Sequence, residues 1–192
     1  DEIDNFIMAG WPTNGITEAI AELLAYKNVQ GLGLGGSSQE EREHLLALAT
    51  LWYLVDMGGQ ALTEIETWKW IYENPDASGE DVRDAVLSIS EEVWNTYFAE
   101  IFNGVRDQHI LSIYNHFITG SLYLNQYFLG NVIMFQLHEA SKSKDLASFL
   151  KAACKEGNTL PELWMEKAVG SPISLDPVLN ASVKAIEFFN KD

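Results

Sequence analysis

The sequence is short of cysteine, of basic residues and of long apolar runs, and each shortage excludes a class of protein. Its single cysteine, Cys154, excludes an internal disulfide. Only 12 basic residues stand against 28 acidic ones, for a formal net charge of −16. Nucleic-acid affinity depends on neutralising phosphates, so no nucleic-acid partner is expected, and an anionic membrane is disfavoured for the same reason. The charge is typical of a soluble protein, and the alternative is a preference for cationic ligands.

Two further absences concern the fold. No uninterrupted apolar run reaches the roughly 18 to 20 residues of a membrane span, and the most apolar stretch, residues 123–137, is broken by asparagines and glutamines. It predicts a buried helix and no membrane partner. Alternation of polar and apolar residues never persists, so strands are not expected. With 192 residues, the sequence predicts a single all-α domain over residues 1–192.

Helical patterns cover most of the chain. A helix over residues 13–30 should end in the glycine-rich segment 31–36, and the serines at 37 and 38 open a capping-box pattern with the glutamates at 40 and 41. Gly58 and Gly59 indicate a kink or a close packing contact within the helix that follows. The remaining helices are expected over residues 39–73, 78–89, 90–102, 122–141, 144–156 and 160–169, and from 175 onward, with a loop before 122.

Known catalytic motifs are incomplete. Gly31, Gly33 and Gly36 have the spacing of a dinucleotide fingerprint, but a helix precedes them where that motif needs a strand, so we interpret them as a turn. No nucleophile elbow G-x-S-x-G is present, and a hydrolase triad is not supported. The chain therefore lacks a complete set of catalytic residues.

The histidines form no metal-binding pair. His138-Glu139 begins like the zinc motif H-E-x-x-H, but Lys142 stands where the second histidine is required. Without a cysteine cluster, a cysteine-based zinc site is also excluded. Scattered single histidines are more often structural than ligating, and this chain has four, at positions 44, 109, 116 and 138.

Two weaker signals remain. Glu18 and Glu22 lie four residues apart and share one helix face, which is either a solvated surface or a paired or metal-bound acidic site. Tyr123 and Tyr127 lie one turn apart, with His116 shortly upstream. Hydroxyl and imidazole donors of this kind stabilise oxyanions, and the alternative is aromatic core packing.

Three segments resemble one peptidase family. Residues 10–25, GWPTNGITEAIAELLA, resemble the helix that carries the third zinc ligand in gluzincin peptidases of the angiotensin-converting-enzyme and oligopeptidase group. Residues 127–140, YFLGNVIMFQLHEA, resemble a later segment of the converting enzymes. The run from Glu162 through Pro172 to the last helix is similar to that family's C-terminal end. Residues 37–108 share only their helical character with it.

The resemblance implies a helical, deep-channel zinc peptidase acting on peptides. Glu18 would be the third zinc ligand, and Glu22 would steady a ligand histidine. Tyr127 would stabilise the tetrahedral intermediate, with His116 near the family's oxyanion histidine, although its spacing to Tyr127 differs by one residue. Tyr123 would line the same site.

One departure from the family limits this interpretation. The H-E-x-x-H motif, which supplies two zinc ligands and the general base, would lie about 25 residues before Glu18 and hence before residue 1. One ligand does not make a tetrahedral zinc site. We therefore expect the C-terminal part of a peptidase, inactive alone and retaining zinc weakly at best, whose partner is the missing N-terminal part. The alternatives are a non-catalytic helical binding domain derived from that fold and an unrelated helical bundle.

Overall fold

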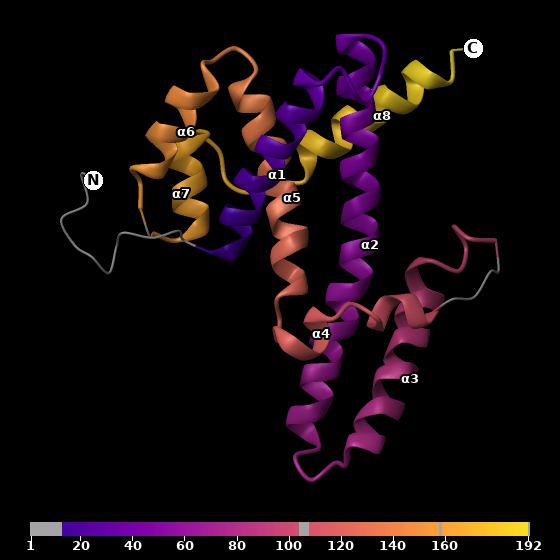
Figure 1. Cartoon of the computed structure of the whole chain (residues 1–192). Coiled ribbons are helices and arrows are strands. Elements are labelled where there is room, and N and C mark those ends of the chain that lie inside the picture. Colours follow the sequence, from indigo (N-terminus) through magenta and orange to yellow (C-terminus); the bar gives the residue numbers. More distant parts are fainter. Residues whose placement is uncertain (1–12, 104–107, 158, 192) are drawn as a thin grey trace. The chain divides into compact units, whose positions relative to one another are not determined.

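The computed structural model describes residues 13–103, 108–157 and 159–191, and no strand occurs among them (Figure 1). This confirms the all-α expectation. Residues 10–12, which open the first resembling segment, lie outside the described part. The elements follow in the order α1 (Asn14–Gly31), α2 (Gln39–Glu73), α3 (Gly79–Tyr97), the 3-10 helix η2 (Gln108–Ser112), α4 (His116–Thr119), α5 (Leu124–Ser141), α6 (Leu146–Cys154), α7 (Pro161–Ala168) and α8 (Asp176–Phe189).

The turn between α1 and α2 follows from its residues. Gly33, Gly35 and Gly36 have φ values of 71°, 80° and 128°, a region that favours glycine. Ser38 then caps α2, because its hydroxyl accepts a hydrogen bond of 3.1 Å from the backbone N–H of Glu41. The glycine-rich segment is thus a turn between two helices, as its context predicted.

Helix α3 corrects one expectation. Two helices were expected, over residues 78–89 and 90–102, with Ser90 opening the second. The structure instead has one helix, Gly79–Tyr97, and Ser90 is completely buried within it. Ser90, Val93 and Trp94 lie on the buried face. Packing of this face keeps the helix continuous at Ser90, although serine otherwise favours helix starts. Part of the expected loop is also helical, as η2 and α4.

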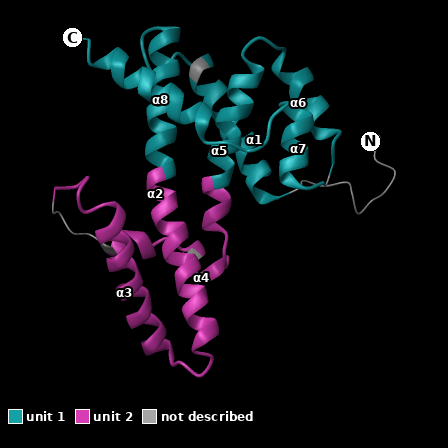
Figure 2. Cartoon of the chain, turned by 180° about the vertical axis from the view of Figure 1, so that it is seen from behind, with its two compact units in different colours: residues 1–54, 129–192 teal, residues 55–128 magenta. Residues whose placement is uncertain are grey.

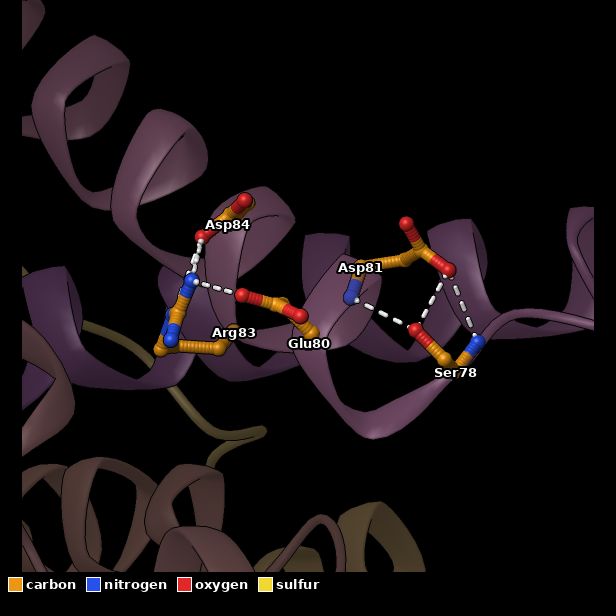
Figure 3. Close-up of polar contacts among 5 residues, drawn as sticks. All are labelled: Ser78, Glu80, Asp81, Arg83 and Asp84. Carbon is orange, nitrogen blue, oxygen red and sulfur yellow. Dashed lines mark hydrogen bonds and ion pairs between the residues drawn. The ribbon is translucent and has the colours of Figure 1, made fainter.

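The start of α3 is fixed by Ser78 (Figure 3). Its hydroxyl accepts a hydrogen bond of 3.2 Å from the backbone N–H of Asp81, whose carboxylate accepts one of 2.9 Å from the backbone N–H of Ser78. This is a complete capping box. Arg83 also pairs with Glu80 at 3.3 Å and with Asp84 at 2.7 Å, but exposed pairs of this kind add little stability.

The chain divides into two compact units (Figure 2). Unit 1 comprises residues 1–54 and 129–192, and unit 2 comprises residues 55–128. Helices α2 and α5 contribute residues to both units. The prediction of a single domain over the whole chain stays a prediction.

Unit 1 is built around the later part of α5. Every residue from Gly130 to His138 is buried, which confirms the expected buried helix. Its polar members find partners: Gln136 donates a hydrogen bond of 2.9 Å to the carbonyl of Pro172 and accepts one of 3.0 Å from the N–H of Ser174. These bonds offset the cost of burying an amide. Other large side chains buried in this unit are Ile16, Leu23, Trp164, Met165 and Val178.

Unit 2 has an aromatic core. Trp94 stacks on Phe98 and Phe102, with ring centroids 5.4 Å apart in both pairs. Helix α2 comes close to this stack at Gly59, where an added β-carbon would lie 2.6 Å from Cε2 of Phe98. Of the two predicted roles for the glycine pair, close packing therefore applies at Gly59, whereas a β-carbon added at Gly58 would make only an ordinary contact with Phe128, at 3.5 Å.

Helix α2 is, by length and composition alone, long and apolar enough to cross a membrane. The criterion is an average over 18 residues, so a helix with interspersed polar residues meets it although no uninterrupted apolar run is present. Core helices of soluble proteins meet it too, and a single such helix is weak evidence. The expectation of no membrane partner stays a prediction.

Candidate functional site

Four rings from three segments meet in unit 2. Tyr114, His116, Tyr123 and Tyr127 form what we call the tyrosine–histidine cluster. The His116 ring stacks between Tyr114 and Tyr123, with centroids 5.2 Å apart and an interplanar angle of 23° on both sides. Tyr127 meets His116 edge-on, at 5.6 Å and 88°. All four side chains are half-buried, so the cluster is neither sealed in the core nor fully exposed.

Local structure places these rings. His116 is the first residue of α4, and Tyr127 lies in the first turn of α5. Tyr123 directly precedes α5, four residues before Tyr127, and their ring centroids are 5.3 Å apart. Tyr114, which sequence reasoning missed, lies two residues before His116 and also meets Tyr127 edge-on, at 6.0 Å. The signal that could have found it is a third tyrosine next to the candidate histidine.

The cluster has the chemistry of an oxyanion site. Tyrosine hydroxyls and an imidazole N–H donate hydrogen bonds, and such donors stabilise negative charge that develops in a transition state. Nδ1 of His116 is buried and has no hydrogen-bond partner among the residues that the structure describes. Buried polar atoms are seldom left this way, but Nδ1 of His138 in unit 1 has the same status, so this feature alone does not separate a functional role of His116 from aromatic core packing.

A buried carboxylate bonds to the backbone on both sides of Tyr123, next to the cluster. Glu64 of α2 has no exposed surface, and its two oxygens accept hydrogen bonds from the backbone N–H groups of Leu122, at 2.6 Å, and Leu124, at 3.2 Å. The pKa of Glu64 is raised above its ordinary value, because burial of the carboxylate has the largest effect. These two N–H groups, the N–H of Tyr123 and the charge of His116 act in the opposite direction and lower the pKa.

Sequence reasoning also missed Glu64, although a signal was present. Met57, Ala61, Glu64 and Trp68 follow one another at intervals of four, three and four residues, the spacing of one helix face. Three of these positions are apolar. An acid on an apolar stripe must be paired or hydrogen-bonded, which marks Glu64 for attention.

Glu18 and Glu22 lie on α1 in unit 1. Glu18 is half-buried and Glu22 is exposed. The pKa of Glu22 is raised, first by partial desolvation of its carboxylate and then by the charge of Glu18. The solvated-face interpretation therefore suits Glu22 better than Glu18.

The backbone near Glu18 is held by close helix packing. A β-carbon added to Gly130 of α5 would lie 2.8 Å from Cβ of Glu18 and 3.1 Å from the carbonyl oxygen of Gly15. Ala19 is completely buried at this contact surface, as expected for a small residue in a close helix approach. Ala21 and Ala25 of the same helix are exposed.

The structure brings together three of the predicted residues, His116, Tyr123 and Tyr127, within unit 2. Glu18 and Glu22 belong to unit 1. The resemblance assigns Glu18 and Tyr127 to one active site; they belong to different units, and that assignment stays a prediction.

One group of potential metal ligands occurs among the described residues. Oxygen and nitrogen atoms of Glu43, His138 and Glu139 lie within 4.8 Å of one another. The ammonium of Lys142 lies 3.0 Å from Glu43 and 2.7 Å from Glu139, so a cation already bridges these carboxylates. Glu43 also accepts a hydrogen bond of 2.7 Å from Nε2 of His138. We call these four residues the ion cluster and assign it a structural role.

The electrostatics of the ion cluster agree with that role. Glu43 is partly desolvated, which raises its pKa, but hydrogen bonds and charges from His138 and Lys142 outweigh this and bring the pKa to about 2. Lys142 is likewise desolvated, yet Glu139 and Glu43 raise its pKa. Each of these two charges is thus stabilised by its neighbours.

The described residues do not form a complete zinc site around Glu18, which is absent from the one ligand group found there. Zinc would need further ligands from elsewhere. The other two histidines lie elsewhere: His44 packs on Phe188 with ring centroids 4.4 Å apart, and His109 is exposed in η2.

No family model, no curated protein and no solved structure matches this chain.

Proposed function

We propose that this chain is the C-terminal part of a zinc metallopeptidase that hydrolyses oligopeptides. The tyrosine–histidine cluster carries the proposal, because it joins His116, Tyr123 and Tyr127, the residues to which the family resemblance assigns the oxyanion side of the site. The other support is the half-buried position of Glu18 on a closely packed helix.

Each residue has a defined role in this proposal. The Tyr127 hydroxyl and the His116 imidazole donate hydrogen bonds to the oxyanion of the tetrahedral intermediate. Tyr114 and Tyr123 hold the imidazole between their rings and limit its rotation. Glu18 supplies one metal ligand, and Glu22 accepts a hydrogen bond from the ring N–H of a ligand histidine.

The remaining groups must come from outside this chain. An H-E-x-x-H motif in the preceding sequence would supply two histidine ligands and the glutamate that activates water. The residues described in this chain do not complete a zinc site, and zinc belongs to the intact protein.

A non-catalytic helical binding domain is the second candidate, and helix α8 favours it. One side of α8 buries Val178 and Ala185, whereas the adjacent side exposes Leu179, Val183 and Ile186, at 44%, 56% and 48% of their surface. An apolar stripe of this kind is typical of a helix that packs against another segment or partner.

The test compares this chain with the protein extended by its preceding coding sequence. We expect the extended protein to contain zinc and to hydrolyse a fluorogenic oligopeptide in a chelator-sensitive manner. Glu18→Gln should lose both zinc and activity, whereas Glu40→Gln, an exposed acid in the first turn of α2, should retain both. A preceding sequence without H-E-x-x-H would favour the binding domain.

The chain alone provides the complementary measurement. Calorimetry should show no zinc binding in the micromolar range, and no peptide hydrolysis should be detected. Micromolar binding that disappears in Glu18→Ala would contradict the expectation that Glu18 acts only with ligands from the preceding sequence.

A further inference from the structure

The backbone on either side of Tyr123 is held by one buried side chain. Glu64 contacts the N–H groups of Leu122 and Leu124, 58 and 60 positions later in the chain. Both carboxylate oxygens are used, one on each side of Tyr123. The carboxylate thus fixes the segment that presents the Tyr123 ring.

This segment has a backbone that needs support. Leu122 has a φ of 60°, in the left-handed region that residues with a β-carbon rarely adopt. Its side chain is 41% exposed, so packing of the leucine does not compensate for the strained conformation. The short hydrogen bond to Glu64 is the contact that stabilises it.

The same carboxylate acts on the start of α5. Leu124 is the first residue of that helix, where backbone N–H groups have no partner within the helix and negative charge is favourable. Tyr127 lies three residues further along, in the same first turn. A carboxylate that fixes the helix start therefore also fixes the direction of the Tyr127 side chain.

The effect extends from Tyr123 to His116. The imidazole stacks on Tyr123, and both side chains border Gly120, where an added β-carbon would make ordinary contacts at 3.4 Å from Cδ2 of His116 and 3.5 Å from Cβ of Tyr123. A shift of residues 122–124 would therefore displace the ring on which His116 rests.

We infer that Glu64 is a positioning residue, whose buried carboxylate holds residues 122–124 so that Tyr123, Tyr127 and His116 keep their relative positions. Burying a carboxylate in a helix face is costly, and an apolar residue would fill this space without that cost. The geometry of the backbone it holds explains its presence. The catalytic consequence rests on the proposed function, but the positioning itself does not.

The first measurement needs no activity. In Glu64→Gln the amide keeps one acceptor and turns its NH2 group towards a backbone N–H, so at least one of the hydrogen bonds to residues 122–124 is lost. Hydrogen exchange of the Leu122 and Leu124 amides should then accelerate about 10- to 100-fold, and the NMR signal of the His116 ring should shift while those of His44 and His138 stay in place. Glu66→Gln, a matched loss of charge at a residue of α2 that pairs with exposed Lys69, should change neither.

Two outcomes would overturn the inference: unchanged exchange and an unchanged His116 signal in folded Glu64→Gln, or equal changes in Glu66→Gln. If Glu64→Gln does not fold, Glu64→Asp gives the same decision. Its shorter carboxylate reaches one N–H group and should give smaller changes of the same kind, and a spectrum identical to the wild type would overturn the inference.

The second measurement uses the extended protein. Glu64→Gln should lower kcat at least about 10-fold with KM changed less than about twofold, because misplaced donors affect the transition state more than substrate binding. Glu64→Asp should recover part of the loss. If the wild type shows no peptidase activity while the NMR changes occur, the proposed function fails and the positioning role stands. Unchanged kcat alongside those NMR changes would overturn the catalytic part of the inference.

Discussion

Each unit places a histidine, a glutamate and a tyrosine together, but in different ways. In unit 1, Tyr26 meets His138 edge-on at 5.1 Å and 89°, and Glu43 bonds directly to the imidazole. In unit 2, Tyr127 meets His116 edge-on at 5.6 Å and 88°, but Glu64 bonds to the backbone behind the ring. The ring geometry is nearly the same, and the position of the carboxylate differs.

That difference separates a structural site from a candidate catalytic one. The carboxylate of Glu43 fixes His138, which is completely buried, and Lys142 supplies the balancing charge. His116 is half-buried between two tyrosines, and its ring is not bonded by Glu64. A histidine that must act on a substrate needs a fixed position and an available nitrogen, and an anchor on the backbone provides the first without using the second.

The largest expected effect comes from removing the Tyr127 hydroxyl in the extended protein, and the control removes a tyrosine hydroxyl in unit 1. Tyr127→Phe should lower kcat about 10²- to 10³-fold, the usual cost of losing an oxyanion donor, with a smaller change in KM. Tyr26→Phe removes a hydroxyl from the equivalent ring in unit 1 and should leave kcat within about twofold. Steady-state kinetics on a fluorogenic peptide measures both. Equal effects of the two changes would remove the distinction between the clusters.

The next effect concerns the aromatic core of unit 2. In Gly59→Ala the new methyl group would lie 2.6 Å from Cε2 of Phe98 and 3.0 Å from Cδ2 of Leu111. The stacked rings leave little room to relax, so the free energy of unfolding should fall by about 2 to 3 kcal/mol. Urea denaturation measures this change.

Gly58→Ala is the control for that change. Its methyl group would make an ordinary contact with Phe128 at 3.5 Å, and alanine favours a helix over glycine by up to about 1 kcal/mol. We therefore expect an unchanged or slightly higher free energy of unfolding. Similar destabilisation by both alanines would contradict the close packing assigned to Gly59.

Acid should affect the two units with opposite sign. The pKa of Glu43 is lowered from 4.5 to about 2 in the folded state, so its contribution is complete above pH 4.5 and is lost as the pH falls from 4.5 to 2. We expect a loss of about 1 to 2 kcal/mol over this window. Glu64 has a raised pKa, so its protonation favours the folded state as the pH falls through that value.

Stability measured against pH in two variants separates these contributions. Glu43→Gln should flatten the decrease between pH 4.5 and 2, whereas Glu64→Gln should steepen the overall loss of stability towards acid. A Glu43→Gln curve parallel to that of the wild type would show that the ion cluster does not stabilise unit 1.

The smallest effect is local and lies in neither cluster. Ser78→Ala removes the capping box of α3 and should lower the free energy of unfolding by about 1 kcal/mol. Ser88→Ala, at an exposed position within the same helix, should be neutral or slightly stabilising. Thermal unfolding compares the two, and equal midpoints would show that the cap does not fix the helix start.

The sequence predicted the helices where their ends carry local signals. The bounds of α2 follow from Ser38 and from the Asn74-Pro75 pair, and α5 follows from its high apolar content, although asparagines and glutamines interrupt it. Prediction failed at Ser90, because a serine within a helix and a serine at its start look alike until the packing of Trp94 is known. Local signals thus predict helix ends better than helix interiors.

The candidate site was predicted in part for the same reason. His116, Tyr123 and Tyr127 lie within 12 consecutive positions, so their proximity follows from local chain geometry. Glu64 lies 58 positions before Leu122, and no local pattern connects the two. Tyr114 was missed because stacking on a histidine depends on the path of the chain between them and not on a fixed period.

The sequence by itself determined the all-α class, the acidic surface and the positions of most helices, because composition, periodicity and caps act over a few residues. The tertiary structure decided which groups Glu43 and Glu64 bind. Glu43 and Glu64 are both acids of the same helix, α2, and nothing in their neighbouring residues states that one bonds an imidazole and the other a strained backbone. The partners depend on which atoms the fold brings within about 3 Å of each carboxylate, because a buried charge is stabilised by the hydrogen-bond donors that tertiary packing places next to it.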